Sequence, residues 1–197
     1  LARFNEDALR IFRAIRFSAQ LNFRIEEKTK KAIAFLAPNL ANISAERICA
    51  ELIKTITSDS PCKMRLAYEL GVTKIVLPEF DAMMETEQNT KHHWFSVGEH
   101  TIKTMENIPA DRDLRLTMLL HDIGKPQCKR TDENGVDHFK THAAASEKIA
   151  EDIMKRLKLD NDTIKRVRML IRFHDWHYIP DEVNVRRLMH DLGDGLM

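Results

Sequence analysis

The sequence predicts an all-α protein built from two consecutive helical parts. Apolar residues recur at helical spacing along most of the chain, as with Ile48, Leu52 and Ile56. No sustained stretch alternates apolar and polar residues as a half-buried strand would, and the chain holds only six glycines. The one clear hairpin-turn signal is Asn134-Gly135, in a long polar loop. We therefore expect little or no sheet.

The helices are predicted from apolar spacing and from residues that start or stop a helix. Asn5 is expected to cap the first helix, whose positive first turn would hold two acidic side chains, and Pro38 to follow the second. The expected helices of the first part are about Glu6–Gln20, about 26–36, one capped by Ser44, and one from Ser60-Pro61 to Gly71. Those of the second part are about 97–107, 112–121, 142–158, 161–174 and 185–192.

The boundary between the two parts is predicted from the distribution of histidine and arginine. All nine histidines lie between His92 and His190, whereas the first part is rich in arginine. The polar stretch "ETEQNTKHH", from Glu85 to His93, lies between them. We therefore expect one domain over residues 1–88 and a second over residues 89–197.

Composition bounds the class of protein. Hydrophobic residues make up 43% of the 197 residues and charged residues 31%, which is typical of a soluble globular protein. No apolar stretch approaches the roughly 18 residues that cross a membrane, so no membrane partner is expected. The net charge of +1 offers no global argument for nucleic acid. Three scattered cysteines, Cys49, Cys62 and Cys128, form no disulfide or metal pattern and suggest a reducing cytoplasm.

The stretch "LLHDIGKP" points to a metal site. The apolar run Leu116–Leu120 ends abruptly in His121-Asp122, and the residues that follow stop the helix. A polar pair at the end of an apolar helix is costly unless it has a partner, and a divalent metal can take both imidazole and carboxylate. Adjacent helical residues point about 100° apart, so the two can meet one ion only where the helix ends.

Further ligands must come from other helices. His100 lies in "GEHTIKTM", and each of His142 and His174 belongs to another predicted helix. His100 with the His121-Asp122 pair predicts a metal site, whereas His142 and His174 fit a ligand role and a hydrogen-bonded role equally. Histidine-rich ligation favours Mn, Fe, Ni or Co over Mg alone. The remaining histidines are expected to be solvated or hydrogen-bonded, and they are His92, His93, His138, His177 and His190.

These segments, read as "GEHT…RLTMLLHDIGKP…HF..H…H", resemble the HD superfamily of metal-dependent phosphohydrolases. The resemblance implies a helical bundle in which His100, His121 and Asp122 ligate metal, and in which His142 and His174 serve a second metal. The family's last ligand is a late aspartate. Asp175 and Asp191 are the nearby candidates and neither fits well, so the last ligand is expected beyond Met197, with Asp175 as the one internal alternative. Catalysis would rest on His121, Asp122 and Lys125, although Lys125 is equally a helix C-terminal cation.

The first part resembles the neck of tRNA nucleotidyltransferases and of bacterial poly(A) polymerases of the second class. The resemblance rests on "RFNEDALRIFRAIRFSAQLNFRIEEKT", "ISAERICAELIK", "GVTKIVLPEF", "QNTKHH" and "NVRRLMHDLG". In that family the pattern E-D-x-x-R reads the base of incoming CTP or ATP, and here it falls on Glu6, Asp7 and Arg10. Arg13 continues the stripe and could meet phosphate. The residues alone favour a solvated salt-bridge stripe, and the resemblance reverses that preference.

What this sequence lacks narrows the function further. Nucleotide addition needs a head domain with a glycine-serine phosphate turn and paired aspartates for Mg²⁺, and no such elements occur here. The chain does not begin with methionine, so we expect the head upstream of Leu1 in a longer parent that acts on CTP, ATP and the tRNA 3′ end.

Three interpretations follow from the two resemblances. The first is a nucleotidyltransferase fragment that carries an HD phosphohydrolase acting on a phosphoester, and we favour it. The second is a free-standing HD nucleotidase whose first helices serve as scaffold. The third is a helical RNA-binding module with a degenerate HD site. The sequence leaves the metal, the physiological substrate and the oligomeric state open.

Overall fold

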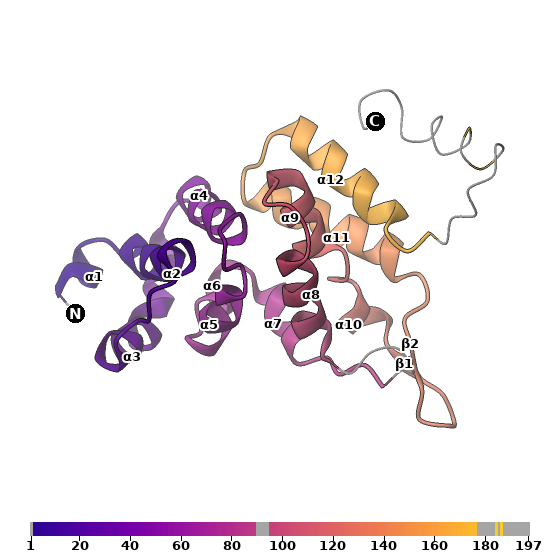
Figure 1. Ribbon diagram of the computed structural model, residues 1–197, viewed down its shortest axis with the longest axis horizontal. Coiled ribbons are helices and arrows are strands. Elements are labelled where there is room, and N and C mark those ends of the chain that lie inside the picture. The colour runs from indigo at the N-terminus through magenta and orange to yellow at the C-terminus, as the bar shows by residue number, and fades with distance from the viewer. Residues whose placement is uncertain (1, 90–94, 177–183, 185, 187–197) are drawn as a thin grey trace.

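The computed structural model describes residues 2–89, 95–176, 184 and 186, and within these ranges the chain is almost entirely helical (Figure 1). The predicted all-α fold is confirmed. The first part holds α1 (Ala2–Glu6), α2 (Leu9–Leu21), α3 (Glu27–Leu36), the 3-10 helix η1 (Ala37–Asn42), α4 (Ala45–Ile56), α5 (Lys63–Glu69), α6 (Thr73–Val76) and α7 (Pro78–Met84). The second holds α8 (Val97–Glu106), α9 (Arg112–Leu120), α10 (Lys125–Cys128), β1 (Arg130–Thr131), β2 (Asp137–His138), α11 (His142–Arg156) and α12 (Asn161–Phe173).

The first predicted helix begins three residues later than expected, because α2 starts at Leu9 and not at Glu6. The expected cap, Asn5, lies inside the separate short helix α1, so that part of the prediction was wrong. The chain leaves the helix after Glu6, and the Oδ1 atom of Asp7 accepts a hydrogen bond from the N–H of Leu9 at 3.1 Å. An aspartate that bonds a nearby backbone N–H competes with the helix, so it favours a helix start over a helix interior. Asp7 therefore forms a local turn just before α2, whose N-cap residue is Ala8. Ser44 precedes α4 as predicted, but its side chain accepts no capping hydrogen bond.

The other expected helices of the second part match α8, α9, α11 and α12 to within two residues, whereas the helix predicted over 185–192 lies largely outside the described residues. The short helices α6, α7 and α10 were not predicted. The hairpin signal is confirmed: β1 and β2 pair antiparallel, and Gly135 adopts a φ of 76°, which favours glycine.

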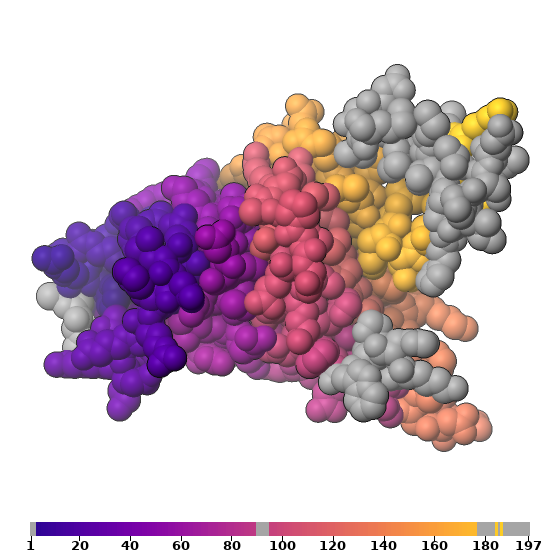
Figure 2. Space-filling view, viewed as in Figure 1, coloured from indigo at the N-terminus to yellow at the C-terminus, as the bar shows by residue number. Residues whose placement is uncertain are grey.

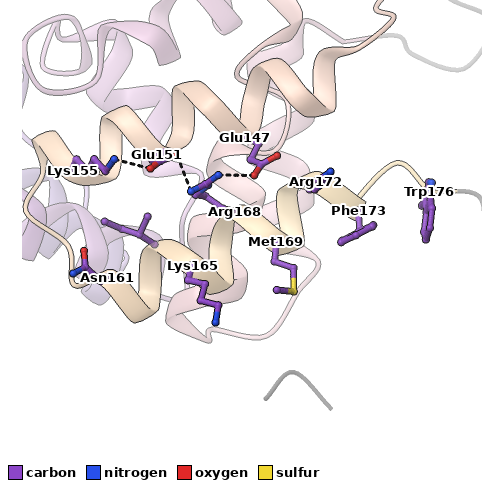
Figure 3. Close-up of a pocket in the computed structure, with 11 residues that line it drawn as sticks. Glu147, Glu151, Lys155, Asn161, Lys165, Arg168, Met169, Arg172, Phe173 and Trp176 are labelled. Atoms are coloured by element: carbon purple, nitrogen blue, oxygen red, sulfur yellow. Dashed lines mark hydrogen bonds and ion pairs between the residues drawn. The ribbon is translucent and has the colours of Figure 1, made fainter. Parts of the chain in front are cut away.

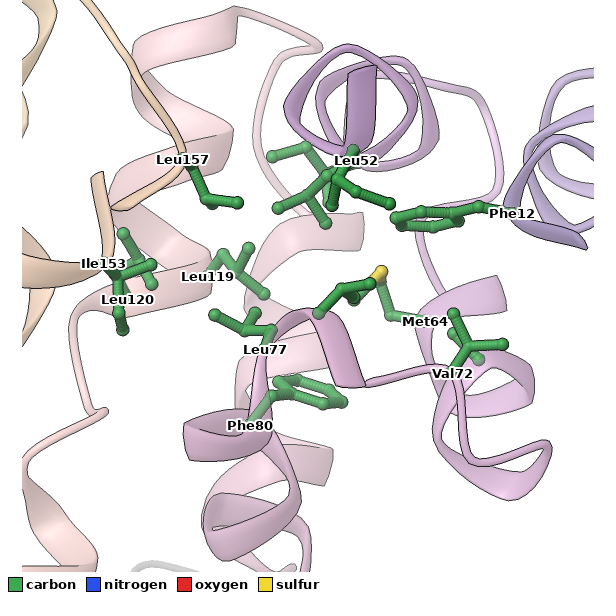
Figure 4. Packing of buried hydrophobic residues seen from close by; sticks show 14 of the residues in the cluster. Phe12, Leu52, Met64, Val72, Leu77, Phe80, Leu119, Leu120, Ile153 and Leu157 are labelled. Atoms are coloured by element: carbon green, nitrogen blue, oxygen red, sulfur yellow. The ribbon is translucent and has the colours of Figure 1, made fainter. Parts of the chain in front are cut away.

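The two helical parts share one hydrophobic core. Figure 4 shows Phe12, Leu52 and Met64 of the first part in the same packed cluster as Leu119 and Ile153 of the second. The division at residue 88 therefore separates sequence segments that are packed together, and it stays a prediction.

Polar contacts also join the two parts. The Arg65 guanidinium of α5 pairs with the Glu99 carboxylate of α8, and Nη1 of Arg115 in α9 donates to the Ile56 carbonyl at the end of α4 at 3.1 Å. No helix in the described part of the chain combines the length and the apolar character needed to cross a bilayer.

Candidate metal centre

Five side chains meet beside the buried end of α9. That helix ends at Leu120, so His121 and Asp122 fall in the following turn, where their side chains are only 5% and 1% exposed. The other three are histidines: His100 comes from the middle of α8, His142 begins α11 and His174 follows the last residue of α12. The structure thus brings together all five residues that the sequence singled out as candidate ligands.

Asp122 lies at the centre of this cluster. Its Oδ2 atom is 3.1 Å from Nε2 of His121 and 3.8 Å from Nε2 of His100. Its Oδ1 atom is 3.4 Å from Nε2 of His142 and 3.6 Å from Nε2 of His174. Each carboxylate oxygen therefore faces its own pair of imidazoles.

Backbone carbonyls fix the tautomer of three of these histidines. Nδ1 of His121, His142 and His174 lies 2.7, 2.8 and 2.6 Å from the carbonyl oxygen of the residue three positions earlier. A carbonyl only accepts, so Nδ1 carries the proton, and in the neutral ring the lone pair of Nε2 faces Asp122. Such a hydrogen bond at the second ring nitrogen is the usual support of a metal-bound histidine.

In this tautomer the Nε2 atoms of the histidines are hydrogen-bond acceptors, and they face one another and the Asp122 oxygens, which are acceptors too. Nε2 of His142 is 3.2 Å from Nε2 of His174, and both oxygens of Asp122 are buried without a hydrogen bond. Lys125 offers one positive charge, with Nζ 2.8 Å from Oδ2 as an ion pair outside hydrogen-bond geometry. A buried carboxylate ringed by imidazole lone pairs is costly unless further cations lie among them.

The charges in the cluster suit a cation. Burial acts to raise the pKa of the Asp122 carboxyl, but His121, His174 and Lys125 outweigh it and hold that pKa well below its usual range, so Asp122 is ionised. Burial lowers the pKa of His142, which keeps this ring neutral. For His174 burial also acts to lower the pKa, yet Asp122 outweighs it and raises the pKa.

The donor atoms fit two metal positions that share Asp122. His100, His121 and Asp122 form one group, and Asp122, His142 and His174 form the other, with the ligand atoms of each group within 4.8 Å of one another. Imidazole and carboxylate together suit Mn, Fe, Co, Ni or Zn better than Mg, which prefers oxygen ligands.

Gly124 permits the close approach that brings His142 to Asp122. A Cβ atom at position 124 would lie 2.6 Å from the backbone nitrogen of Ser146 and 2.9 Å from the carbonyl oxygen of His142. The Gly124 N–H also donates to Oγ of Ser146 at 2.9 Å. The glycine of "HDIGKP" is thus needed for space, because it lets the turn after α9 pack directly against the first turn of α11.

Lys125 and Asp175 both lie next to the cluster, but only Lys125 is buried against Asp122. Lys125 is 7% exposed, and besides its contact with Asp122 its Nζ donates to Oε1 of Gln88 at 3.0 Å. Gln88 was missed by the sequence analysis, because nothing in its local pattern marks a contact with a residue 37 positions later. Asp175 is 59% exposed, with Oδ2 4.0 Å from Nε2 of His142, and it belongs to neither group of ligand atoms.

The remaining histidine predictions divide by position. His138 lies on the hairpin, where its Nε2 is 2.8 Å from Oδ2 of Asp132, as expected of a hydrogen-bonded histidine. The other four histidines of this set lie outside the described residues, and they are His92, His93, His177 and His190. Asp191, a candidate for the last metal ligand, lies outside them too.

The predicted nucleotide-reading residues lie at the opposite end of the molecule, and each has a partner or a ring contact. Nη1 of Arg10 donates to the Glu6 carboxylate at 2.6 Å, and the Asp7 carboxylate accepts from Nη2 of Arg47 at 2.8 Å. Arg13 is exposed, with its guanidinium 5.9 Å from the centre of the Phe17 ring. Arg47 was not anticipated, because it lies 40 residues from Asp7 in the sequence.

A separate groove of about 910 Å³ follows α11 and α12 (Figure 3). Arg168 lies across it, with Nη2 2.9 Å from Glu147 and Nη1 2.9 Å from Glu151. Met169 and Trp176 also line the groove, whereas none of the five cluster residues does. The groove is therefore distinct from the candidate metal centre.

Comparison with known proteins gives the same two parts in the same order. Residues 22–84 match the family described as "Probable RNA and SrmB- binding site of polymerase A", and residues 90–189 match the HD domain family. The A-adding tRNA nucleotidyltransferase of Deinococcus radiodurans is 31% identical over 196 residues, which cover 93% of this chain and 45% of that relative. This chain thus spans less than half the length of that relative. The resemblance seen in the sequence is confirmed, and the chain belongs to the HD domain family, with the RNA-binding region of the polymerase A family before the HD domain.

Proposed function

We propose that the HD part of this chain is a metal-dependent phosphohydrolase that acts on a phosphoester. The observation that carries the proposal is the buried Asp122 carboxylate, which makes no hydrogen bond and is faced by the Nε2 atoms of four histidines. A structural aspartate would be expected to have hydrogen-bond donors at both oxygens. Ligands held in this way by four separate segments are the usual design of a metal site inside a helical bundle.

In this proposal five side chains of the cluster would bind metal, and Lys125 would position the phosphate of the substrate. His100, His121 and Asp122 would hold one metal ion, and His142 and His174 would hold a second with the other oxygen of Asp122. The bound metal would activate water and polarise the phosphoryl oxygen. Lys125 would help to position the phosphate, because its ammonium lies within the cluster and Gln88 holds it there.

Metal content tests this proposal directly. The chain purified without chelator should hold a divalent transition metal by elemental analysis, and His121→Ala should lose most of it, because its Nε2 is the imidazole nitrogen nearest to Asp122. His138→Ala is the matched control, since it removes a half-exposed histidine–aspartate contact outside the cluster. Equal metal content in wild type and His121→Ala would contradict the proposal.

Activity separates the phosphohydrolase from a degenerate site. In the full-length protein, hydrolysis of a 2′,3′-cyclic nucleotide should depend on added Mn²⁺, Co²⁺ or Ni²⁺ and should disappear in His121→Ala, whereas the 197-residue chain should hydrolyse it weakly or not at all. A chain that binds neither metal nor phosphoester would support the alternative of an RNA-binding module with a degenerate HD site.

We also propose that the chain is part of a tRNA nucleotidyltransferase that acts on the tRNA 3′ end with CTP or ATP. The supporting observation is the 31% identity to a relative of that name over 93% of this chain, although this chain spans only 45% of that relative. Asp7, Arg10 and Glu6 would then read the base, and Arg13 would contact phosphate. A Mg²⁺-dependent head would lie in the longer protein.

Substitution of Arg10 in the full-length protein tests this second role. Arg10→Ala should lower CTP and ATP incorporation and leave metal content unchanged, because α2, which carries Arg10, lies well apart from α11 and α12, which position His142 and His174 (Figure 1). Unaltered discrimination between CTP, ATP, UTP and GTP in Arg10→Ala would refute the base-reading role.

A further inference from the structure

A basic groove lies between the three N-terminal helices, far from the metal cluster. Figure 2 shows these helices, coloured indigo, at one end of the molecule. The groove has a volume of about 910 Å³. Its lining combines cationic side chains with two phenylalanines and includes no carboxylate, and it consists of Arg3, Phe4, Arg10, Lys28, Thr29, Lys31, Ala32 and Phe35.

The cations of the groove are mostly not neutralised. In the described part of the chain Arg10 pairs with Glu6, whereas Arg3, Lys28 and Lys31 form no ion pair. Lys31 lies four residues after Glu27 and helps to lower the pKa of that carboxyl after Lys30, so its charge is partly offset. Because neither Glu27 nor any other carboxylate lines the groove, its four cations still leave it with a positive potential.

The apolar part of the groove is unusually accessible. Phe35 is 78% exposed, more than any other large apolar side chain in the described residues. It lies on α3 seven residues after Lys28 and four after Lys31, so all three project from one face of that helix. Phe4 of α1 is half-buried and lines the same groove. The ring of Phe35 thus stands beside cations with its face available for stacking.

We propose that this groove binds a single-stranded segment of RNA, with a base stacked on Phe35 and the adjoining phosphates on Lys28, Lys31 and Arg3. A positive groove with an exposed aromatic ring is the usual means by which proteins bind a single strand. A duplex offers no free base face for the ring, because its bases are stacked on one another. A second copy of this chain would bring the same cations together and is disfavoured by charge repulsion.

This inference rests on the proposal that the chain is part of a tRNA nucleotidyltransferase, for which it names a further RNA contact, and it does not depend on the HD site. Binding of a labelled oligo(A) strand is measured by fluorescence anisotropy with the 197-residue chain in the presence of chelator, so that a metal at the HD site cannot hold phosphate. Phe35→Ala should weaken binding about tenfold. Changing Lys28 and Lys31 together to glutamine should reduce the salt dependence of log K by about 1.4, since each phosphate contact with a single strand contributes about 0.7.

Matched variants separate the groove from general charge and exposure. Phe23→Ala removes another exposed phenylalanine, 64% exposed and outside the groove, and should bind as wild type does. Lys54→Gln with Lys74→Gln removes two exposed lysines elsewhere and should leave the salt dependence nearly unchanged. Circular dichroism confirms that Phe35→Ala is folded.

Three outcomes would overturn the proposal. The first is equal affinity of wild type and Phe35→Ala for the strand, and the second is tighter binding of wild type to a duplex of the same length. The third is a dimer of the wild-type chain that Phe35→Ala converts to a monomer without any effect on RNA binding, because a second copy would then be the occupant.

Discussion

Replacing Gly124 with alanine should separate the turn after α9 from α11 and so disturb one half of the metal centre. The added Cβ atom would lie 2.6 Å from the Ser146 nitrogen, 2.8 Å from Cβ of Ala145 and 2.9 Å from the His142 oxygen. Two of these atoms belong to the backbone of α11, so no side-chain rotation relieves the contact. The helix must move by several tenths of an ångström, and His142, its first residue, must move with it.

The size of the effect follows from two opposing contributions. Forcing an extra carbon atom into a packed interface costs about 1–3 kcal/mol. Gly124 has a φ of −85° and a ψ of −14°, which alanine also adopts, so the substitution regains about 0.4–1 kcal/mol through the unfolded chain. The difference spans roughly 0–2.6 kcal/mol, with about 1.3 kcal/mol at the middle of the range. For a chain of this length, the middle value lowers Tm by roughly 3–5 °C.

Thermal unfolding in chelator measures the stability, and elemental analysis measures the metal. Gly124→Ala should lower Tm and, if the proposed sites are occupied, also weaken metal binding at the site proposed for His142 and His174 more than at the site proposed for His100 and His121. Gly135→Ala is the control, because it strains a positive-φ turn in the exposed hairpin and should reduce stability without changing metal content. Wild-type Tm together with wild-type metal content in Gly124→Ala would refute the packing argument.

Two further predictions concern contacts that hold the helices together. Arg115→Met should destabilise the chain by about 2–4 kcal/mol in urea unfolding, because the buried guanidinium donates to carbonyls that include Ile56 and Pro109 and these would lose their partner; an unchanged urea midpoint would contradict this. The two guanidinium nitrogens of Arg156 donate to the Glu79 carboxylate at 2.7 and 2.8 Å. Burial acts to raise the pKa of the Glu79 carboxyl, but the bonds from Arg156 outweigh burial and lower that pKa. The pair therefore stabilises the fold above the ordinary glutamate pKa, and the contribution is lost as pH falls through the lowered value. Glu79→Gln should flatten stability over this acidic range, and an unchanged pH profile would refute the role.

The sequence predicted the parts of the site that depend on local pattern. Apolar spacing placed His100, His142 and His174 on separate helices, and the abrupt end of an apolar run marked His121 and Asp122. The helix positions of these residues match the structure because helical periodicity and helix stops are properties of neighbouring residues, whereas their roles as ligands stay predictions. The fold class followed from the same signals together with the scarcity of glycine.

Contacts between distant segments could not be predicted from the residues alone. Gln88 reaches Lys125 across 37 positions, and Arg47 reaches Asp7 across 40. The late start of α2 has the same origin in part, because Asp7 is held both by its bond to the Leu9 N–H and by the distant Arg47. The spatial need for Gly124 was equally hidden, since the glycine in "HDIGKP" read as a helix stop and only the packing of α11 shows why no side chain fits.

The position of Asp122 makes the two halves of the metal centre interdependent. One oxygen faces His100 and His121 and the other faces His142 and His174, so a rotation of the carboxylate that improves one set of distances worsens the other. The turn that carries Asp122 is fixed on one side by α9 and on the other by the contact of Gly124 with α11. Because α9 is itself tied to α4 through a buried arginine, the geometry of the centre depends on packing that begins in the first part of the chain.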